Sequence, residues 1–150
     1  MKIPLSWIRE FAAIPQDLSL EALENAFVNV GFEVEGIDLQ GRDLKGPLVV
    51  GKVVAIEELT GNKKPIRYVE LDCGEAKTRF VICGATNFAV NDLVVAALPG
   101  AVLPGDFAIS ARETYGKTSN GMICSARELG ISDEHSGIIV LPTDCAKVGS

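Results

Sequence analysis

Apolar residues at helical spacing predict a short helix near the start of the chain. Leucine, isoleucine and phenylalanine recur every third position over residues 5–11, so they fall on one side of a helix within residues 4–13. Ser6 is the expected N-cap, because its hydroxyl can accept a hydrogen bond from the first turn. Pro15 then ends the helix, since proline has no amide hydrogen to donate.

A second helix has matching signals at both ends. Ser19 is a good N-cap residue, and apolar residues repeat at helical spacing over residues 20–30. Gly31 can take the left-handed conformation that closes a helix, and Phe32 can fold back onto Phe27 in a Schellman ending. The start, the apolar face and the stop therefore predict the same element.

Beyond this helix the pattern changes to alternation and turn residues. Residues 33–39 predict one strand, and residues 42–47, with glycine and proline among charges, predict a linker. Turn dipeptides then separate short β-rich segments, which is typical of a closed or partly open barrel. Strands are expected at residues 48–56, 67–73, 77–83, 93–97, 107–111, 121–124 and 138–141.

These elements predict an α+β fold that is mainly a β barrel. Residues 1–41 are expected to form a small α/β appendage of two helices and a strand, and residues 48–150 the barrel domain.

The densest run of special backbone positions is residues 119–130. Asn120-Gly121 is a strong hairpin signal, and an apolar strand follows at residues 122–124. Ser125 can cap a single helical turn, which Gly130 closes. We expect this segment to form a fixed corner of the barrel.

Composition limits the classes of function. The 150 residues carry a formal net charge of −6, which disfavours coating of nucleic acid by bulk electrostatics. Contact with nucleic acid would need a local positive patch or a larger partner. No apolar run approaches the roughly 20 residues of a membrane span, and no secretory leader is recognisable. We therefore expect a soluble cytoplasmic protein without a membrane partner.

Signals for catalysis or a metal are weak. The cysteines lack metal-ligand spacing, so we interpret them as buried apolar residues or free thiols. His135, the only histidine, can be imagined as a general base beside Asp133 or Glu134, but a local hydrogen bond explains a loop histidine better. No phosphate-binding glycine motif or nucleophile motif is present. The four cysteines are Cys73, Cys83, Cys124 and Cys145.

A cation cluster indicates contact with RNA. Lys63, Lys64 and Arg67 lie between two predicted strands, next to Tyr68, which can serve as a stacking face. Barrels of the OB type bind oligonucleotides on strands 2 and 3 and through adjoining loops. The other candidate binding residues are Arg79, Asn87, Arg112, Lys117, Ser119 and Arg127, and the other candidate stacking residues are Phe88 and Tyr115.

Several motifs, in order along the chain, resemble one family. Residues 1–11 (MKIPLSWIREF) and 31–35 (GFEVE) are similar to the amino-terminal segment of bacterial phenylalanyl-tRNA synthetase β subunits. Later motifs resemble the tRNA-binding OB domain of those subunits. They are residues 82–87 (ICGATN), 97–105 (ALPGAVLPG), 119–130 (SNGMICSARELG) and 133–137 (DEHSG).

One segment departs from the family pattern. Residues 60–66 read TGNKKPI, where the family usually has a sequence of the type HPNADKL. The contacts that relatives make through that histidine and acidic residue therefore cannot be transferred to this chain. Lys63 and Lys64 are expected to act there as a local cation cluster.

The resemblance implies that this chain is a fragment of a longer β subunit. It would have no catalysis and no cofactor of its own, because the family's α subunit binds ATP, magnesium and phenylalanine. The expected partners are tRNA, the α subunit and the remainder of the β subunit, in an α2β2 tetramer.

Two functions of different classes follow. As an auxiliary tRNA-binding module, the chain would contact phosphates through Lys63, Lys64, Arg67 and Arg79 and offer hydrogen bonds at the barrel rim through Asn87 and Ser119. As a structural assembly module, it would pack against other parts of the synthetase and seldom meet RNA. The net charge of −6 favours assembly, and the cation cluster favours RNA. An independent enzyme, resting on His135 alone, is a distant third.

Overall fold

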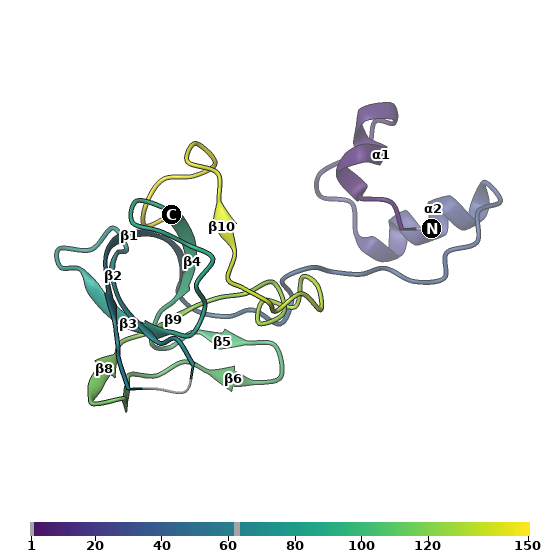
Figure 1. The fold of residues 1–150 in the computed structure, drawn as a ribbon. Helices are drawn as coiled ribbons and strands as arrows, with labels where there is room; N and C mark the ends of the chain where they lie inside the picture. Colours follow the sequence, from purple (N-terminus) through teal and green to yellow (C-terminus); the bar gives the residue numbers. More distant parts are fainter. Residues whose placement is uncertain (1, 62–63) are drawn as a thin grey trace. The chain divides into compact units, whose positions relative to one another are not determined.

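The computed structural model of the protein describes residues 2–61 and 64–150, and the chain divides into two compact units, Met1–Leu39 and Gln40–Ser150 (Figure 1). The units differ in charge. The first holds two Lys or Arg against seven Asp or Glu, a net −5, whereas the second holds twelve against thirteen, a net −1. The acidity of the chain therefore belongs almost entirely to the first unit.

The first unit begins with helix α1 (Leu5–Phe11). Its N-cap is Pro4, with φ −63° and ψ 137°, and no side chain caps it. The prediction that Ser6 is the N-cap is wrong. The fixed φ of proline suits the start of a helix, so the helix begins earlier and places Ser6 in the first turn.

Helix α2 (Leu20–Asn29) has both predicted ends. The hydroxyl of Ser19 accepts a hydrogen bond from the amide of Ala22. At the other end, Gly31 has φ +92° and donates to Val28 O, while the Phe32 amide donates to Phe27 O; both bonds are 3.0 Å long. The rings of these two phenylalanines meet edge to face at 6.1 Å. The Schellman ending is confirmed.

Residues 33–39 form neither a strand nor a helix, so that prediction is wrong, and the regular elements in the described part of the first unit are α1 and α2. A strand needs a neighbour to satisfy its backbone groups, and none of the described residues pairs with this segment. Its recorded polar contact is instead an ion pair between Asp38 and Lys2, 2.5 Å apart. No residue of either helix is buried.

The second unit is a β barrel built on a six-stranded sheet in the order β10-β4-β1-β2-β3, with β9 also paired to β4. All its pairings are antiparallel. The strands of the sheet are β1 (Leu48–Glu58), β2 (Arg67–Asp72), β3 (Arg79–Cys83), β4 (Leu93–Ala97), β9 (Met122–Ile123) and β10 (Val140–Leu141).

The long strand β1 lets the sheet curl. Its first part, Leu48 to Lys52, pairs with β4, and its second part, Lys52 to Glu58, pairs with β2. A bulge between Val53 and Ala55 lies in the second part, just after the two parts meet at Lys52, and a bulge bends a strand and increases its twist. Figure 1 shows the strands wrapping around a common axis.

Hydrogen bonds from residues 119–120 close most of the remaining gap. The Ser119 hydroxyl accepts from Ile82 N at 2.9 Å, and the Asn120 amide donates to Phe80 O at 2.7 Å. The chain then continues into β9 on β4, so β3 and β4 are linked through this segment. The predicted α+β fold with a mainly β, OB-type barrel is confirmed.

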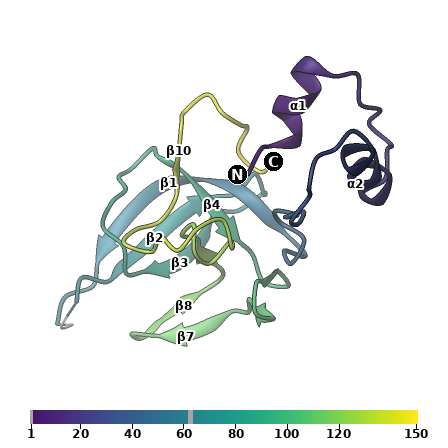
Figure 2. The same cartoon turned by 90° about the vertical axis from the view of Figure 1, so that its right-hand side faces the viewer.

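Residues 112–119 form a separate β-hairpin. Strands β7 (Arg112–Thr114) and β8 (Lys117–Ser119) are joined by Tyr115 and Gly116, with φ +52° and +72° (Figure 2). Two consecutive left-handed residues are what a type I′ turn requires. The remaining short strands are β5 (Val102–Leu103) and β6 (Phe107–Ala108), which pair with each other.

Asn120-Gly121 is not a hairpin turn, so that prediction is wrong. The strand before it, β8, pairs with β7, whereas the strand after it, β9, pairs with β4. Gly121 has φ +135°, and a Cβ there would lie 2.8 Å from Ala97 O. Glycine is therefore required by a close backbone approach at a corner rather than by a hairpin.

The corner at residues 125–130 forms as expected. The Ser125 hydroxyl accepts from Glu128 N at 3.4 Å, and the Glu128 carboxylate accepts from Ser125 N at 2.5 Å, a capping box. Gly130, with φ +68°, donates to Arg127 O, and Ile131 N donates to Ala126 O. These bonds close a single helical turn in the Schellman manner.

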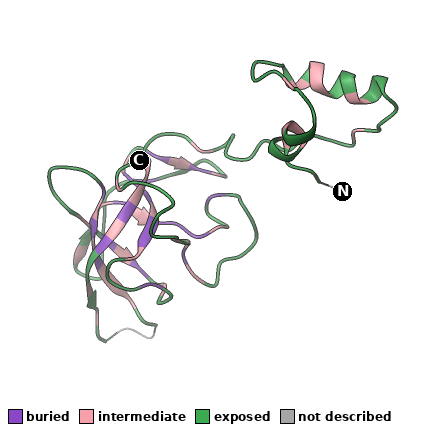
Figure 3. Cartoon of the chain, turned by 90° about the horizontal axis from the view of Figure 1, so that it is seen from above, coloured by how far each residue is buried: buried purple, intermediate pink, exposed green. Residues whose placement is uncertain are grey.

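Two apolar clusters form the core of the barrel unit, and Figure 3 shows the buried residues along its strands. The first is formed mainly by residues of the six-stranded sheet. The second includes residues of β4, β5 and the corner at residues 125–130. Three cysteines are buried and Cys145 is exposed, and all four are free thiols, as predicted. The largest buried residues of the first cluster are Val53, Val69, Leu71, Val81 and Val94, and the second contains Ala97, Ala101, Leu103, Ile109, Cys124 and Leu129.

The last residues pair with the start of the barrel. Gly149 N donates to Val50 O at 2.8 Å, and Val50 N donates to Ser150 O at 3.0 Å. A Cβ on Gly74 would lie 2.7 Å from the Cα of Gly149, so both glycines permit this contact. No helix in the described part of the chain has the length and apolar character to cross a bilayer.

Candidate nucleic-acid interface

Two stacked aromatic rings lie on the outer face of β2 and β3. Residues alternate between the two faces of a strand, so burying Val69 and Val81 turns Tyr68 and Phe80 outward. Their ring centroids are 5.1 Å apart and the ring planes differ by 20°. Phe80 remains 40% exposed. Open aromatic faces on an OB barrel are the surface on which bases stack.

A lysine joins these rings from the neighbouring hairpin. Lys117 Nζ lies 4.8 Å from the centroid of the Tyr68 ring and 3.2 Å from Glu57 Oε2. The Tyr68 hydroxyl donates to Thr118 O at 3.3 Å, which ties β8 to β2. We call Tyr68, Phe80 and Lys117 the aromatic platform.

Lys64, one residue of the predicted cation cluster, precedes the platform residue Tyr68 in the chain. Lys64 is exposed in the loop that leads into β2, four residues before Tyr68. Lys63 lies outside the described residues. A lysine in this loop can reach the backbone of a nucleic acid whose base stacks on the platform.

Arg67 has internal partners. Its side chain is 16% exposed, and Nε donates to Glu58 Oε1 at 2.7 Å. A second nitrogen donates to Phe88 O at 2.9 Å, and the guanidinium lies 5.1 Å from the centroid of the Phe88 ring. These contacts fasten the start of β2 to residue 88. A phosphate contact from Arg67 stays a prediction.

Arg79 is also paired. It forms a two-point interaction with Glu75, with one bond of 2.7 Å from its terminal nitrogen to Oε1 and another from Nε to Oε2. The hydrogen bond to Arg79 lowers the pKa of the Glu75 carboxyl, and the same bond raises the pKa of Arg79. A phosphate would have to compete with this carboxylate.

Asn87 and Ser119 make structural contacts. The Asn87 amide donates to Ile138 O at 2.8 Å and accepts from Ile138 N at 3.0 Å, joining two loops. Ser119 is buried, and its hydroxyl, which accepts from Ile82 N, donates to Gly121 O at 3.0 Å. Their proposed contacts to RNA stay predictions.

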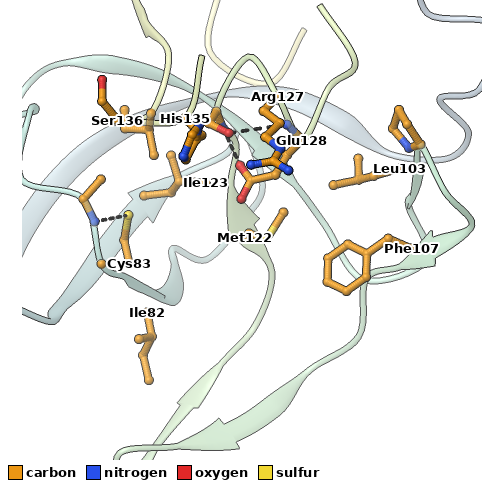
Figure 4. Close-up of a pocket in the computed structure, with 16 residues that line it drawn as sticks. Ile82, Cys83, Leu103, Phe107, Met122, Ile123, Arg127, Glu128, His135 and Ser136 are labelled. Carbon is orange, nitrogen blue, oxygen red and sulfur yellow. Dashed lines mark hydrogen bonds between the residues drawn. The ribbon is translucent and has the colours of Figure 1, made fainter. Parts of the chain in front are cut away.

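Arg112 and Arg127 belong to a second region. The guanidinium of Arg112 lies 5.4 Å from the centroid of the Phe107 ring. Arg127 is exposed, and its side chain has no hydrogen bond or ion pair within the described residues. Phe107 and Arg127 line a cleft of about 710 Å³ (Figure 4). Of the predicted cations in the described residues, Lys117 therefore belongs to the platform and Arg127 to the cleft.

His135 has the local bond expected of a loop histidine: Nδ1 lies 3.0 Å from Asp133 O. The neighbouring Glu134 carboxylate accepts from Ser136 N at 2.7 Å, and hydrogen bonding to the Ser136 side chain lowers its pKa. The part of the chain that the structure describes contains no group of three His, Cys, Asp or Glu side chains that could hold a metal ion.

The exposed aromatic residues of the barrel differ from the predicted stacking residues at Phe80 and Phe88. Phe80 is exposed on the platform, whereas Phe88, predicted as a stacking face, is buried beneath Arg67. The alternation along β3 could have identified Phe80, because its neighbour Val81 points into the core and Phe80 must therefore point outward. Tyr115 is exposed at the tip of the β7–β8 hairpin.

Comparison with known proteins agrees with the motifs. Residues 48–150 match the family described as putative tRNA binding domain. The whole chain is 53% identical over 154 residues to the phenylalanine–tRNA ligase β subunit of Thermobifida fusca and 52% identical over 153 residues to that of Mycolicibacterium paratuberculosis. In both cases it covers 18% of the relative. The resemblance to these subunits is confirmed, and the chain spans less than a fifth of their length.

Two solved structures share the fold. The CsaA chaperone protein from Picrophilus torridus aligns with a TM-score of 0.51 at 13% identity, covering 69% of this chain and 88% of that one. The C-terminal domain of Plasmodium vivax p43 aligns with a TM-score of 0.50 at 20% identity, covering 71% of this chain and 58% of that one. At these identities the likeness concerns the barrel alone. With the match over residues 48–150, the chain belongs to the family of putative tRNA-binding domains.

Proposed function

We propose that the barrel binds tRNA as a module of a phenylalanine–tRNA ligase β subunit and so assists the attachment of phenylalanine to its tRNA in the cytoplasm. The observation that carries the proposal is the aromatic platform on the outer face of β2 and β3, where Phe80 is exposed, Tyr68 stacks beside it and Lys117 lies over Tyr68. OB barrels bind oligonucleotides on this face.

The division of labour follows from the chemistry of the side chains. A base stacks on the open face of Phe80, while Lys117 and the loop lysines Lys63 and Lys64 contact phosphates. Neither kind of contact reads sequence, so selection of one tRNA belongs to the whole ligase. ATP and magnesium would be used by the α subunit, and the α subunit and remaining β chain would complete an α2β2 enzyme.

The net charge is compatible with this role. The barrel unit carries −1 and the first unit −5, so the acidity that disfavours RNA lies outside the barrel. Several acidic groups of the barrel are paired, among them Glu58 with Arg67 and Glu75 with Arg79. These pairs occupy one cation for each acid, so the barrel stays near neutral, and salt screens its remaining charges from a local cation cluster at ordinary ionic strength.

A salt series tests the proposal. If about three phosphates are neutralised, the slope of log affinity for bulk tRNA against log salt should be about −2 to −3. Lys117→Ala and Lys64→Ala should each make the slope shallower by about 1. Lys147→Ala, which removes an exposed lysine elsewhere on the same unit, is the matched control. Affinity that does not respond to salt, or an equal loss in the control, would contradict the proposal.

The aromatic contribution has its own variant. Phe80→Ala should weaken tRNA binding by about 5- to 100-fold, the range that loss of one stacked base implies. Phe11→Ala, which removes an 88% exposed ring from the first unit, should leave binding unchanged. Thermal unfolding of both variants separates loss of contact from loss of fold.

The first unit favours a second function, assembly. It exposes several large apolar side chains, including Trp7 at 62%, and buries none in its helices. Exposed apolar clusters of this kind are typical of protein–protein contacts. In the full ligase, charge reversal at Lys63 and Lys64 that raises KM for tRNA with the subunits still associated supports RNA contact. Loss of the α–β complex would support assembly by the barrel instead.

A further inference from the structure

The cleft lies at the end of the platform. Its lining comes from the end of β3, the β5–β6 hairpin, the helical turn at residues 125–130 and the loop at residues 135–138 (Figure 4). Ile82 in its wall is the direct cross-strand partner of Tyr68. A strand of RNA that stacks on the platform therefore reaches the cleft at Ile82, two residues beyond Phe80 on the same face of β3.

The cleft is suited to a planar, mostly apolar group. Ile82, Met122 and Ile123 line it on one side, and Phe107 faces it from β6 (Figure 4). Phe107 is 41% exposed and lines the cleft, and Arg112 lies 5.4 Å from its ring centroid. The volume of about 710 Å³ falls within the range of small-molecule sites.

The lining of the cleft holds one cation, Arg127, and one carboxylate, Glu128, beside His135. Arg127 is unpaired within the described residues, whereas the neighbouring carboxylate of Glu128 is held by the amide of Ser125 at 2.5 Å. The acid is therefore occupied by the capping box, and the guanidinium is available to an anion. A peptide offers this guanidinium neutral carbonyl acceptors, whereas a nucleotide phosphate offers an anionic one and so a stronger, charge-assisted hydrogen bond.

Gly84 in the cleft wall is not required by the fold. Its φ lies outside the left-handed region, and a Cβ there would meet nothing closer than Ile66 Cδ1 at 4.0 Å. Glycine at such a position permits close approach of another molecule to the backbone. Its amide and carbonyl have no hydrogen bond within the described residues, so both can meet the edge of a base.

We propose that the cleft holds one unstacked nucleotide of bound tRNA. The base lies against Phe107 and the apolar wall, with its edge toward the backbone of Gly84, and the phosphate meets Arg127. Unstacked bases are the part of an RNA that proteins read through stacking and edge contacts. The inference rests on the proposed function and adds a preference for single-stranded over paired RNA.

Binding of three RNA probes to the 150-residue chain tests this preference: bulk tRNA, a single-stranded uridine tetranucleotide and a blunt 12-base-pair RNA duplex. Phe107→Ala should weaken the tetranucleotide by about 5- to 20-fold and leave the duplex unchanged. Arg127→Ala should weaken it several-fold and make the salt slope shallower by about 0.7. Phe11→Ala and Arg42→Ala remove an exposed ring and an exposed arginine elsewhere and should change nothing.

Amide chemical shifts of the unsubstituted chain provide a readout independent of folding. Titration with the tetranucleotide should move the amides of Gly84 and Arg127 together with those of Tyr68 and Phe80. Shifts on the platform without shifts in the cleft would contradict nucleotide binding in the cleft and would leave the proposed function standing. Shifts at neither place, with no tRNA binding, would overturn both. Cleft shifts with an apolar pentapeptide but not with RNA would also overturn the inference.

Discussion

The guanidinium of Arg67 lies over the ring of Phe88, 5.1 Å from its centroid, and donates a hydrogen bond to the carbonyl of the same residue at 2.9 Å. Glu58 Oε1 accepts a further bond at 2.7 Å. One side chain thus joins the end of β1, the start of β2 and the loop after β3. Arg67 therefore stabilises the barrel where the loop that contains Lys64 enters β2.

Arg67→Ala should lower the free energy of unfolding by about 1–3 kcal/mol, since the Phe88 carbonyl and Glu58 lose their donor together. Chemical denaturation measures this. Arg112→Ala, which removes a cation from the exposed ring of Phe107, should cost less than about 1 kcal/mol. A variant at Arg67 that is as stable as the unsubstituted chain but binds tRNA poorly would show that this arginine serves RNA.

Ser119→Ala should destabilise the closure of the barrel. It removes the acceptor of the Ile82 amide and the donor to Gly121 O, in a buried position. A buried donor left without a partner costs about 1–3 kcal/mol. Ser110→Ala, at an exposed position, should stay within about 0.5 kcal/mol. Hydrogen exchange of the Ile82 amide should accelerate in the first variant, and unchanged protection there would contradict the role of Ser119.

Two glycines separate backbone strain from close approach. Gly105 has φ +79° with nothing within 4 Å of a Cβ, so Gly105→Ala carries only the conformational cost, about 1 kcal/mol. Gly121 has φ +135°, and its Cβ would meet Ala97 O at 2.8 Å, so Gly121→Ala should cost about 3 kcal/mol or more. Thermal unfolding compares the two, and equal losses would mean that the corner adjusts.

The thiols should differ in reactivity and in their effect on stability at high pH. Burial raises the pKa of Cys73 to about 11 and that of Cys124 to about 12, above the ordinary 9.0, and also raises the pKa of Cys83. The folded chain therefore favours the protonated thiols. The stability that this contributes is complete below pH 9 and is lost as the pH rises toward 11–12.

Alkylation with iodoacetamide at pH 8 checks this. Cys145 is exposed and should react first, and the three buried thiols should react only after unfolding. Mass spectrometry should show one adduct on the native chain and four in concentrated guanidinium chloride. A second adduct that forms as fast as the first on the native chain would contradict the burial of these thiols.

Features encoded by neighbouring residues could be predicted from the sequence. Ser19 and Gly31 define the ends of α2 because each acts on backbone groups within one turn. The box at residues 125–130 is equally local. The barrel could be predicted from its turn residues, because these mark where strands begin and end and do not depend on which strands pair.

Features that depend on distant partners were not predictable in this way. Residues 33–39 have the composition of a strand but no strand beside them. Gly121 is required because the Ala97 carbonyl approaches it closely, and not because it forms a hairpin turn. The partners of Arg67 lie nine and 21 residues away, so its internal role appears only once the strands are paired.

The pairing of Gly149 and Ser150 with Val50 has a topological consequence. Residues 149–150 lie beside the first part of β1, and two backbone hydrogen bonds join them to Val50. A unit whose ends meet can sit within a surface loop of a host protein without stretching that loop. The same pairing predicts that a circular permutant with a short linker from Ser150 to Leu48 keeps every strand of the barrel in place.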